Sequence, residues 1–196
     1  MPPTDQPRHR LVRSPDRRRS ASAAVRGGEL VLRVPAGLAP DDERELAGRV
    51  LAKVVRRADD AAVPAGPPPS VPARDTRARP GPRGDRLLVA RADAVADRFL
   101  GGVRATRVSW SHRMQSRWGS CTVPSARVRI SSRVSVAPDE VLDHLLLHEL
   151  AHLRETGHGT AFRRLVAQDP AGPAADAWFH HLEVHTLRRA LGRSDA

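Results

Sequence analysis

The first regular pattern of apolar and polar positions lies between Ser20 and Val34. Leu30, Leu32 and Val34 occupy alternate positions, as they would in a strand with one buried face. The two glycines at positions 27 and 28 can supply the positive φ that a two-residue hairpin turn needs, and Pro35 ends the strand. The pattern therefore predicts a β-hairpin.

Helical periodicity follows the hairpin. Acids occupy the first turn from Asp41 onward, where the positive end of a helix stabilises them, and apolar residues recur at helical spacing to about Arg57. We predict an N-terminal lobe of β-hairpin and helix over residues 11–60. Residues 1–10 have little apolar surface to bury and predict a disordered tail.

The periodic pattern is lost over residues 61–85, which are rich in Pro, Gly and Arg and predict a linker or an insertion. A second helix is expected from about Asp85 to Leu100. Strand-like alternation then runs between Thr106 and Val136, interrupted by Arg117–Cys121, which we predict to be a loop.

Three further helices complete the pattern. The first begins at Pro138, a residue suited to the first helical position, and is expected to stop at Gly157. A short helix is predicted over about Thr160–Ala167 and a last one over about Pro173–Leu191. Residues 86–196 are thus predicted to form one α+β domain, with a mixed sheet and helices.

Composition narrows the class of protein. The chain has 196 residues, enough for one domain with a core or for one domain with a small extension. It has no apolar run near the roughly 18–20 residues of a membrane span and no apolar signal core behind its Arg-rich start. We expect a soluble cytoplasmic protein with no membrane contact.

Cys121 is the one cysteine, which excludes an intramolecular disulfide and a cysteine-based zinc ribbon within the chain. A fourth metal ligand and a reactive thiol are both open roles for it. We favour a third role, that of a small buried apolar side chain, because this is the common fate of a lone cysteine.

The positive charge is concentrated in one part of the chain. The net charge is +11, and residues 61–136 hold 14 basic and 4 acidic side chains. No acid lies between Asp97 and Asp139. A field of one sign attracts polyanions, so this stretch predicts accessory binding of a nucleic acid or another polyanion, with a solvated arginine-rich surface as the alternative. Its arginines are Arg104, Arg107, Arg113, Arg117, Arg127, Arg129 and Arg133.

Metal-binding chemistry is concentrated in the helix after Pro138. His148 and His152 are four residues apart, which separates them by about 40° around a helix, so both imidazoles can reach one metal ion. Glu149 is adjacent and can accept a proton from a metal-activated water without binding the metal. This H-E-x-x-H pattern predicts a zinc hydrolase of the zincin type.

His158 is the predicted third ligand, because the chain can turn back once the helix stops. Three protein ligands leave a fourth position for water, as in catalytic zinc sites. The metzincin class is excluded: Glu155 replaces its glycine, and both methionines precede the motif. Glu183 is the alternative third ligand, as in thermolysin-like sites.

The chain has no tyrosine to stabilise an oxyanion, so another group must serve. We expect substrate or transition-state contacts from Arg117, His112, His180 or His181, although surface or helix-packing roles are the commoner fate of such residues. His181 also forms a second pair at helical spacing with His185. His144 lies one turn before His148 and is expected beside the ligands or in solvent.

These motifs resemble a known family. The run Q-S-R-W-G-S-C ending at Cys121, the strand around Val128 and Ile130, and H-E-L-A-H-L-R-E-T-G-H with Phe162 beyond it are similar to the YgjP-type (YgjP-like) metallopeptidase family. That family is related to the SprT and WLM zincins. The similarity covers about residues 104–168 and departs from the family pattern at Arg163, where relatives usually carry Trp.

The resemblance implies a zincin-like metalloprotease domain with His148, His152 and His158 as Zn²⁺ ligands and Glu149 as catalytic base. We therefore predict a zinc metallopeptidase acting on a peptide or protein substrate, which the strand over Val128–Ser131 would pair with. Two alternatives stay open. One is a metal-dependent hydrolase of a phosphate-bearing substrate such as a nucleotide, and the other is a nucleic-acid-binding protein that uses the Arg104–Arg133 stretch.

Overall fold

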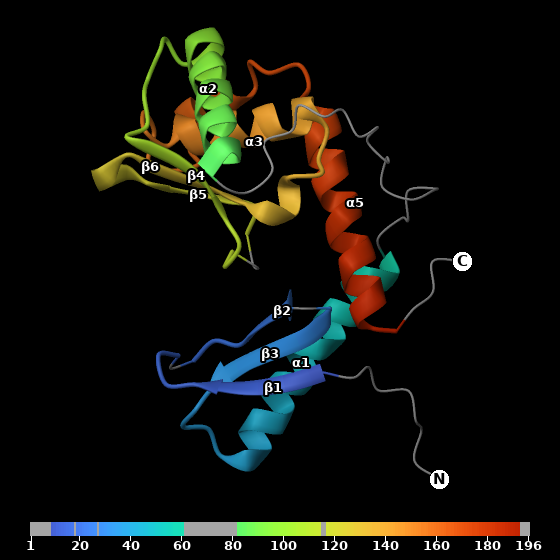
Figure 1. The fold of residues 1–196 in the computed structure, drawn as a ribbon. Coiled ribbons are helices and arrows are strands. Elements are labelled where there is room, and N and C mark those ends of the chain that lie inside the picture. Colours follow the sequence, from blue (N-terminus) through green and yellow to red (C-terminus); the bar gives the residue numbers. More distant parts are fainter. Residues whose placement is uncertain (1–8, 18, 27, 61–81, 115–116, 193–196) are drawn as a thin grey trace. The chain divides into compact units, whose positions relative to one another are not determined.

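The computed structural model describes residues 9–17, 19–26, 28–60, 82–114 and 117–192. The chain divides into two compact units (Figure 1). Unit 1 comprises Met1–Gly66 together with His180–Ala196, and unit 2 comprises Pro67–Phe179. Residues 1–8 of the predicted tail (residues 1–10) and residues 61–81, most of the predicted linker, lie outside the described residues.

Unit 1 contains a three-stranded sheet in the order β1-β3-β2, built from β1 (His9–Ser14), β2 (Ser22–Arg26) and β3 (Glu29–Pro35). Arg26 pairs with Glu29 in an antiparallel register, so the predicted hairpin is present. Gly28 has a positive φ of 82° in its turn, and Gly27 lies outside the described residues. β1 pairs with β3 in parallel. The sequence analysis missed β1, because the strand with which it pairs lies some twenty residues away in the sequence. Its first two residues belong to the segment that we expected to be a disordered tail.

Helix α1 (Pro40–Asp60) forms the core of unit 1 with β3. Leu30 and Ala58 are buried at its centre, and Leu187 and Leu191 from the end of the chain pack against them. Residues 180–196 therefore group with the N-terminal lobe, whereas we expected them in the 86–196 domain. The spacing of apolar residues predicts that this segment has an apolar face. It does not predict against which hydrophobic core that face packs.

Unit 2 is built on a second mixed sheet, in the order β4-β6-β5. Its strands are β4 (Arg107–Ser111), β5 (Gly119–Thr122) and β6 (Arg127–Ser131). β6 is central, parallel to β4 and antiparallel to β5. The expected loop at Arg117–Cys121 therefore contains most of a strand, which was missed because its small residues do not alternate.

The central place of β6 also corrects one expectation about the substrate. Both edges of β6 are paired within the sheet, so Val128–Ser131 has no free backbone groups for a substrate strand. Alternate residues of the sheet face in opposite directions: Val128 and Ile130 are buried, and Arg127 and Arg129 are exposed. Helices α2 and α3 pack against the sheet in unit 2.

Four helices belong wholly or partly to unit 2: α2 (Pro82–Phe99), α3 (Asp139–Ala151), α4 (Thr160–Val166) and the first part of α5 (Gly172–Ala190). Helix α3 ends at Ala151, six residues before the expected stop at Gly157. The amides of Leu153 and Arg154 bond to carbonyls three residues back, which tightens the last turn and ends the helix.

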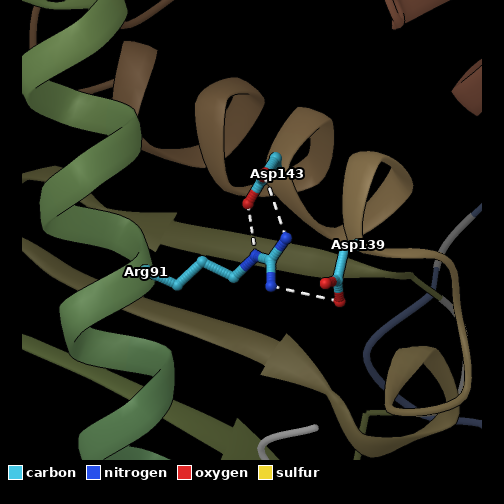
Figure 2. A network of polar contacts seen from close by, with 3 residues as sticks. All are labelled: Arg91, Asp139 and Asp143. Atoms are coloured by element: carbon cyan, nitrogen blue, oxygen red, sulfur yellow. Dashed lines mark hydrogen bonds and ion pairs between the residues drawn. The ribbon is translucent and has the colours of Figure 1, made fainter. Parts of the chain in front are cut away.

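Arg91 fastens α2 to α3 (Figure 2). Its guanidinium donates two hydrogen bonds to the Asp143 carboxylate and forms an ion pair of 3.1 Å with Asp139. Helix α3 is itself buried on several sides, with Leu146 and Leu147 fully inaccessible to solvent. The helix that carries the H-E-x-x-H motif is therefore held rigidly within unit 2.

Two short 3₁₀ turns complete unit 2: Val123–Ser125 joins β5 to β6, and Ser132–Val134 lies between β6 and α3. None of the helices in the described residues has both the length and the apolar character needed to cross a membrane.

Candidate metal centre

The three predicted ligands come together in unit 2. His148 lies in the last turn of α3, His152 caps that helix, and His158 lies in the loop before α4. One ring nitrogen from each lies within 4.8 Å of the other two. The Nε2 atoms of His148 and His158 are 3.2 Å apart, close to the roughly 3.3 Å between two nitrogens that bind one tetrahedral zinc at about 2.0–2.1 Å.

The ring of Phe162 lies against all three imidazoles. Its centroid is 4.9 Å from that of His148, 4.5 Å from that of His152 and 4.7 Å from that of His158. Phe162 is buried. It therefore supplies an apolar wall that excludes water from one side of the cluster.

Burial lowers the pKa of His148 to about 4, and the neighbouring imidazoles of His152 and His158 act in the same direction. A neutral imidazole is the form that binds a metal. The surroundings of His148 thus keep it ready for coordination at neutral pH.

The tautomer of His152 follows from its backbone contact. Its Nδ1 lies 3.2 Å from the carbonyl oxygen of Glu155, and a carbonyl can only accept, so Nδ1 carries the proton and donates. This leaves Nε2 with its lone pair available. A backbone partner of this kind orients metal-binding histidines in many proteins. The donor set, its spacing and its protonation therefore fit a zinc ion.

Glu149 is buried and faces β5. Burial raises the pKa of its carboxyl to about 7, while the charge of Arg117 and a hydrogen bond from the backbone N–H of Cys121 act in the opposite direction. A Cβ built on Gly119 would lie 2.7 Å from Cγ and 2.8 Å from Cδ of Glu149. The absence of a side chain at Gly119 therefore provides the space that Glu149 occupies.

His144, one turn before His148, is buried beside Asp169. Its Nδ1 lies 2.9 Å from Asp169 Oδ2, and Asp169 Oδ1 accepts a hydrogen bond from the amide of Ala171. A Cβ on Gly172 would lie 2.9 Å from the His144 ring. His144 thus anchors the loop between α4 and α5 to α3, the helix that carries His148, a role that spacing alone did not indicate.

The expected substrate contacts have different positions. Arg117 is exposed and interacts electrostatically with Glu149. His112 is exposed in the segment after β4. His180 and His181 belong to unit 1, whereas the three clustered histidines belong to unit 2.

Two alternatives for metal ligation lie outside the cluster. Glu183, the alternative third ligand, also belongs to unit 1 and forms an ion pair of 2.8 Å with Arg57. Cys121 is not part of the cluster found among the described residues. Burial, with the charge of Glu149, raises the pKa of its half-buried thiol, which disfavours the reactive thiolate.

The arginines of the basic stretch divide into two groups. Arg104 pairs with Asp93 and Asp97, which precede it in α2, and Arg133 lies over the ring of Trp118 at 4.1 Å. The second group is exposed and consists of Arg107, Arg127 and Arg129 on the sheet of unit 2, with Arg113 and Arg117 in the segment between β4 and β5. The charges of Arg104 and Arg133 are therefore partly engaged within unit 2, and the other five arginines of the stretch stay exposed.

Residues 86–179 match the family model for the YgjP-like metallopeptidase domain. The chain therefore carries a domain of the YgjP-like metallopeptidase family, and both the resemblance drawn from its motifs and the α+β zincin-like class are confirmed. No curated protein and no solved structure shows a significant match. Membership of this family indicates a metal-dependent peptidase that uses a divalent metal. Nothing in these comparisons supports nucleic-acid binding.

Proposed function

We propose that this protein is a zinc-dependent metallopeptidase in which His148, His152 and His158 bind the metal and Glu149 is the general base. The observation that carries the proposal is the convergence of three imidazole nitrogens within 4.8 Å, on and beside the helix that also holds Glu149. A bound zinc ion would activate a water molecule and polarise the carbonyl of the scissile bond.

Glu149 would move the protons of the reaction. Its pKa of about 7 suits a group that must both accept and release a proton near neutral pH. The carboxylate would take a proton from the attacking water and deliver it to the nitrogen of the leaving amine. The backbone N–H of Cys121 and the close approach of Gly119 hold the carboxylate in one place during both transfers.

β5 is the strand that we now propose to pair with the substrate. In the order β4-β6-β5 it lies at an edge of the sheet, so one of its sides pairs with no strand of that sheet. The N–H of Cys121 in this strand already donates to Glu149, and a substrate would use other main-chain groups of the edge. An extended peptide can add to such an edge through main-chain hydrogen bonds. Because Gly119 begins β5 and contacts Glu149, a peptide on this edge would run beside the catalytic carboxylate. Arg117, just before β5, is the candidate to stabilise the oxyanion.

Glu149→Gln tests the mechanism. The variant keeps the size of the side chain and removes the base, so peptide hydrolysis should fall by about 10²–10⁴-fold while bound zinc stays unchanged. Glu155→Gln is the matched control, because Glu155 contributes only its backbone carbonyl to His152. Full activity of the zinc-loaded Glu149→Gln variant would contradict the proposed role.

The same pair of proteins tests the nucleotide alternative. Release of phosphate from nucleotides by the wild type, lost in Glu149→Gln, together with no peptide hydrolysis, would replace the peptidase proposal with a phosphate-ester hydrolase at the same centre.

A further inference from the structure

The third histidine lies in a loop that its own sequence does little to order. His158 is exposed and stands between Gly157 and Gly159, and neither glycine has an atom within 4 Å of the position that a Cβ would take. Glycine loses more conformational freedom on ordering than any other residue. Something outside the loop must therefore hold His158 beside His148 and His152.

Helix α4 supplies that support through Arg163. Its Nη1 donates a hydrogen bond of 2.8 Å to the carbonyl oxygen of His158, and its Nη2 lies 3.3 Å from Thr160 Oγ1. Among the residues that the structure describes, this guanidinium takes part in no ion pair with a carboxylate. Both of these hydrogen bonds are directed at the His158 loop and the start of α4.

The backbone contact and the ring contact act on opposite ends of the same residue. Arg163 holds the carbonyl of His158, and the preceding residue, Phe162, packs its ring 4.7 Å from the imidazole. A hydrogen bond from a charged donor is stronger than one between neutral groups. Two successive residues of α4 thus fix both the backbone and the side chain of His158.

We infer that Arg163 is a positioning residue that holds His158 in place for metal binding. The inference rests on the proposed three-histidine site and extends it beyond the ligands. Residues that orient metal ligands without touching the metal typically contribute about 10–100-fold to metal affinity.

The test compares Arg163→Ala with Arg164→Ala in the full chain. Arg164 is the exposed neighbour in the same helix. Its replacement also removes one arginine from α4 but leaves the hydrogen bond to His158 in place. Zinc affinity is measured by competition with a chromophoric chelator, and the visible absorption of the Co²⁺-loaded protein reports the number of ligands. Unfolding of the metal-free proteins, followed by tryptophan fluorescence, controls for general destabilisation.

We expect Arg163→Ala to bind zinc about 10–100-fold more weakly and to show a changed Co²⁺ spectrum. Arg164→Ala should match the wild type, and Arg163→Lys, which keeps one charged donor, should recover part of the affinity. In a His158→Ala background, Arg163→Ala should have no further effect, because the two residues act through the same contact.

Two results would overturn the inference alone. These are equal zinc affinities of Arg163→Ala and Arg164→Ala, and a loss in Arg163→Ala that persists undiminished in the His158→Ala background. A His158→Ala variant that binds zinc as tightly as the wild type would instead overturn the three-histidine site, and this inference with it.

Discussion

Gly119 and Glu149 are in such close contact that a side chain at position 119 would displace the glutamate. A Cβ there would lie 2.7 Å from Cγ and 2.8 Å from Cδ of Glu149, and closer still to Oε1. Real Cβ contacts at these distances essentially do not occur, and the glycine begins β5 while the glutamate lies within α3. The strand and the helix are therefore packed so that the carboxylate has one available place.

Gly119→Ala should slow catalysis without removing the metal. The added methyl group would displace the Glu149 carboxylate, and a shift of about 1 Å at a catalytic group costs on the order of 100-fold in rate. Peptide hydrolysis and bound zinc are measured on the same sample. Gly48→Ala, at a helical glycine with open space around it, is the control and should keep its activity. Unchanged hydrolysis in Gly119→Ala would show that Glu149 is not the base.

Asp169→Ala should destabilise unit 2 by about 1–3 kcal/mol, because it leaves the buried Nδ1 of His144 without its partner. Urea unfolding followed by tryptophan fluorescence measures this, since Trp110, Trp118 and Trp178 all belong to unit 2. Asp176→Ala, at an exposed position of α5, should change stability by less than about 0.5 kcal/mol. Equal stabilities of the two variants would mean that the His144–Asp169 contact has no energetic role.

The stability of unit 1 should depend on pH through Glu43. The hydrogen bond from Arg13 lowers the pKa of the Glu43 carboxyl below its usual 4.5. A lowered folded-state pKa stabilises the fold above the unfolded value, and this contribution is lost as pH falls through the folded value. The wild type should therefore be more stable than Glu43→Gln above about pH 4.5, and the difference should shrink below it.

Unit 1 has no tryptophan, so its stability cannot be followed by tryptophan fluorescence. Amide hydrogen exchange in β3, compared between the two proteins at the same pH, measures the effect of Glu43 instead. A difference between wild type and Glu43→Gln that stays constant down to pH 3 would show that the Arg13–Glu43 pair is not the cause.

Local pattern predicted the parts of this protein that local physics determines. The hairpin through Gly28 followed from turn chemistry, and the proximity of His148 and His152 followed from helical spacing. β1 and β5 did not, because short strands acquire their identity from partners elsewhere in the chain. For the same reason the last residues of α5 could not be assigned to the core around Leu30.

The supporting contacts of the candidate site depend on tertiary structure and could not be predicted from spacing. Asp169 is 25 residues from His144, and the requirement for glycine at position 119 becomes visible only when β5 lies against α3. Arg163 drew attention in the sequence only as a departure from a family pattern. Its hydrogen bond to the His158 carbonyl depends on the geometry of the turn between α3 and α4. The apolar periodicity of the two helices does not predict that geometry.

The zinc content of the wild type and of His158→Ala tests the central claim most directly. We expect one zinc per chain in the wild type, a sharp fall in His158→Ala, and no change in His180→Ala, a control at an exposed histidine outside the cluster. Zinc retained in full by His158→Ala would contradict a site formed by His148, His152 and His158.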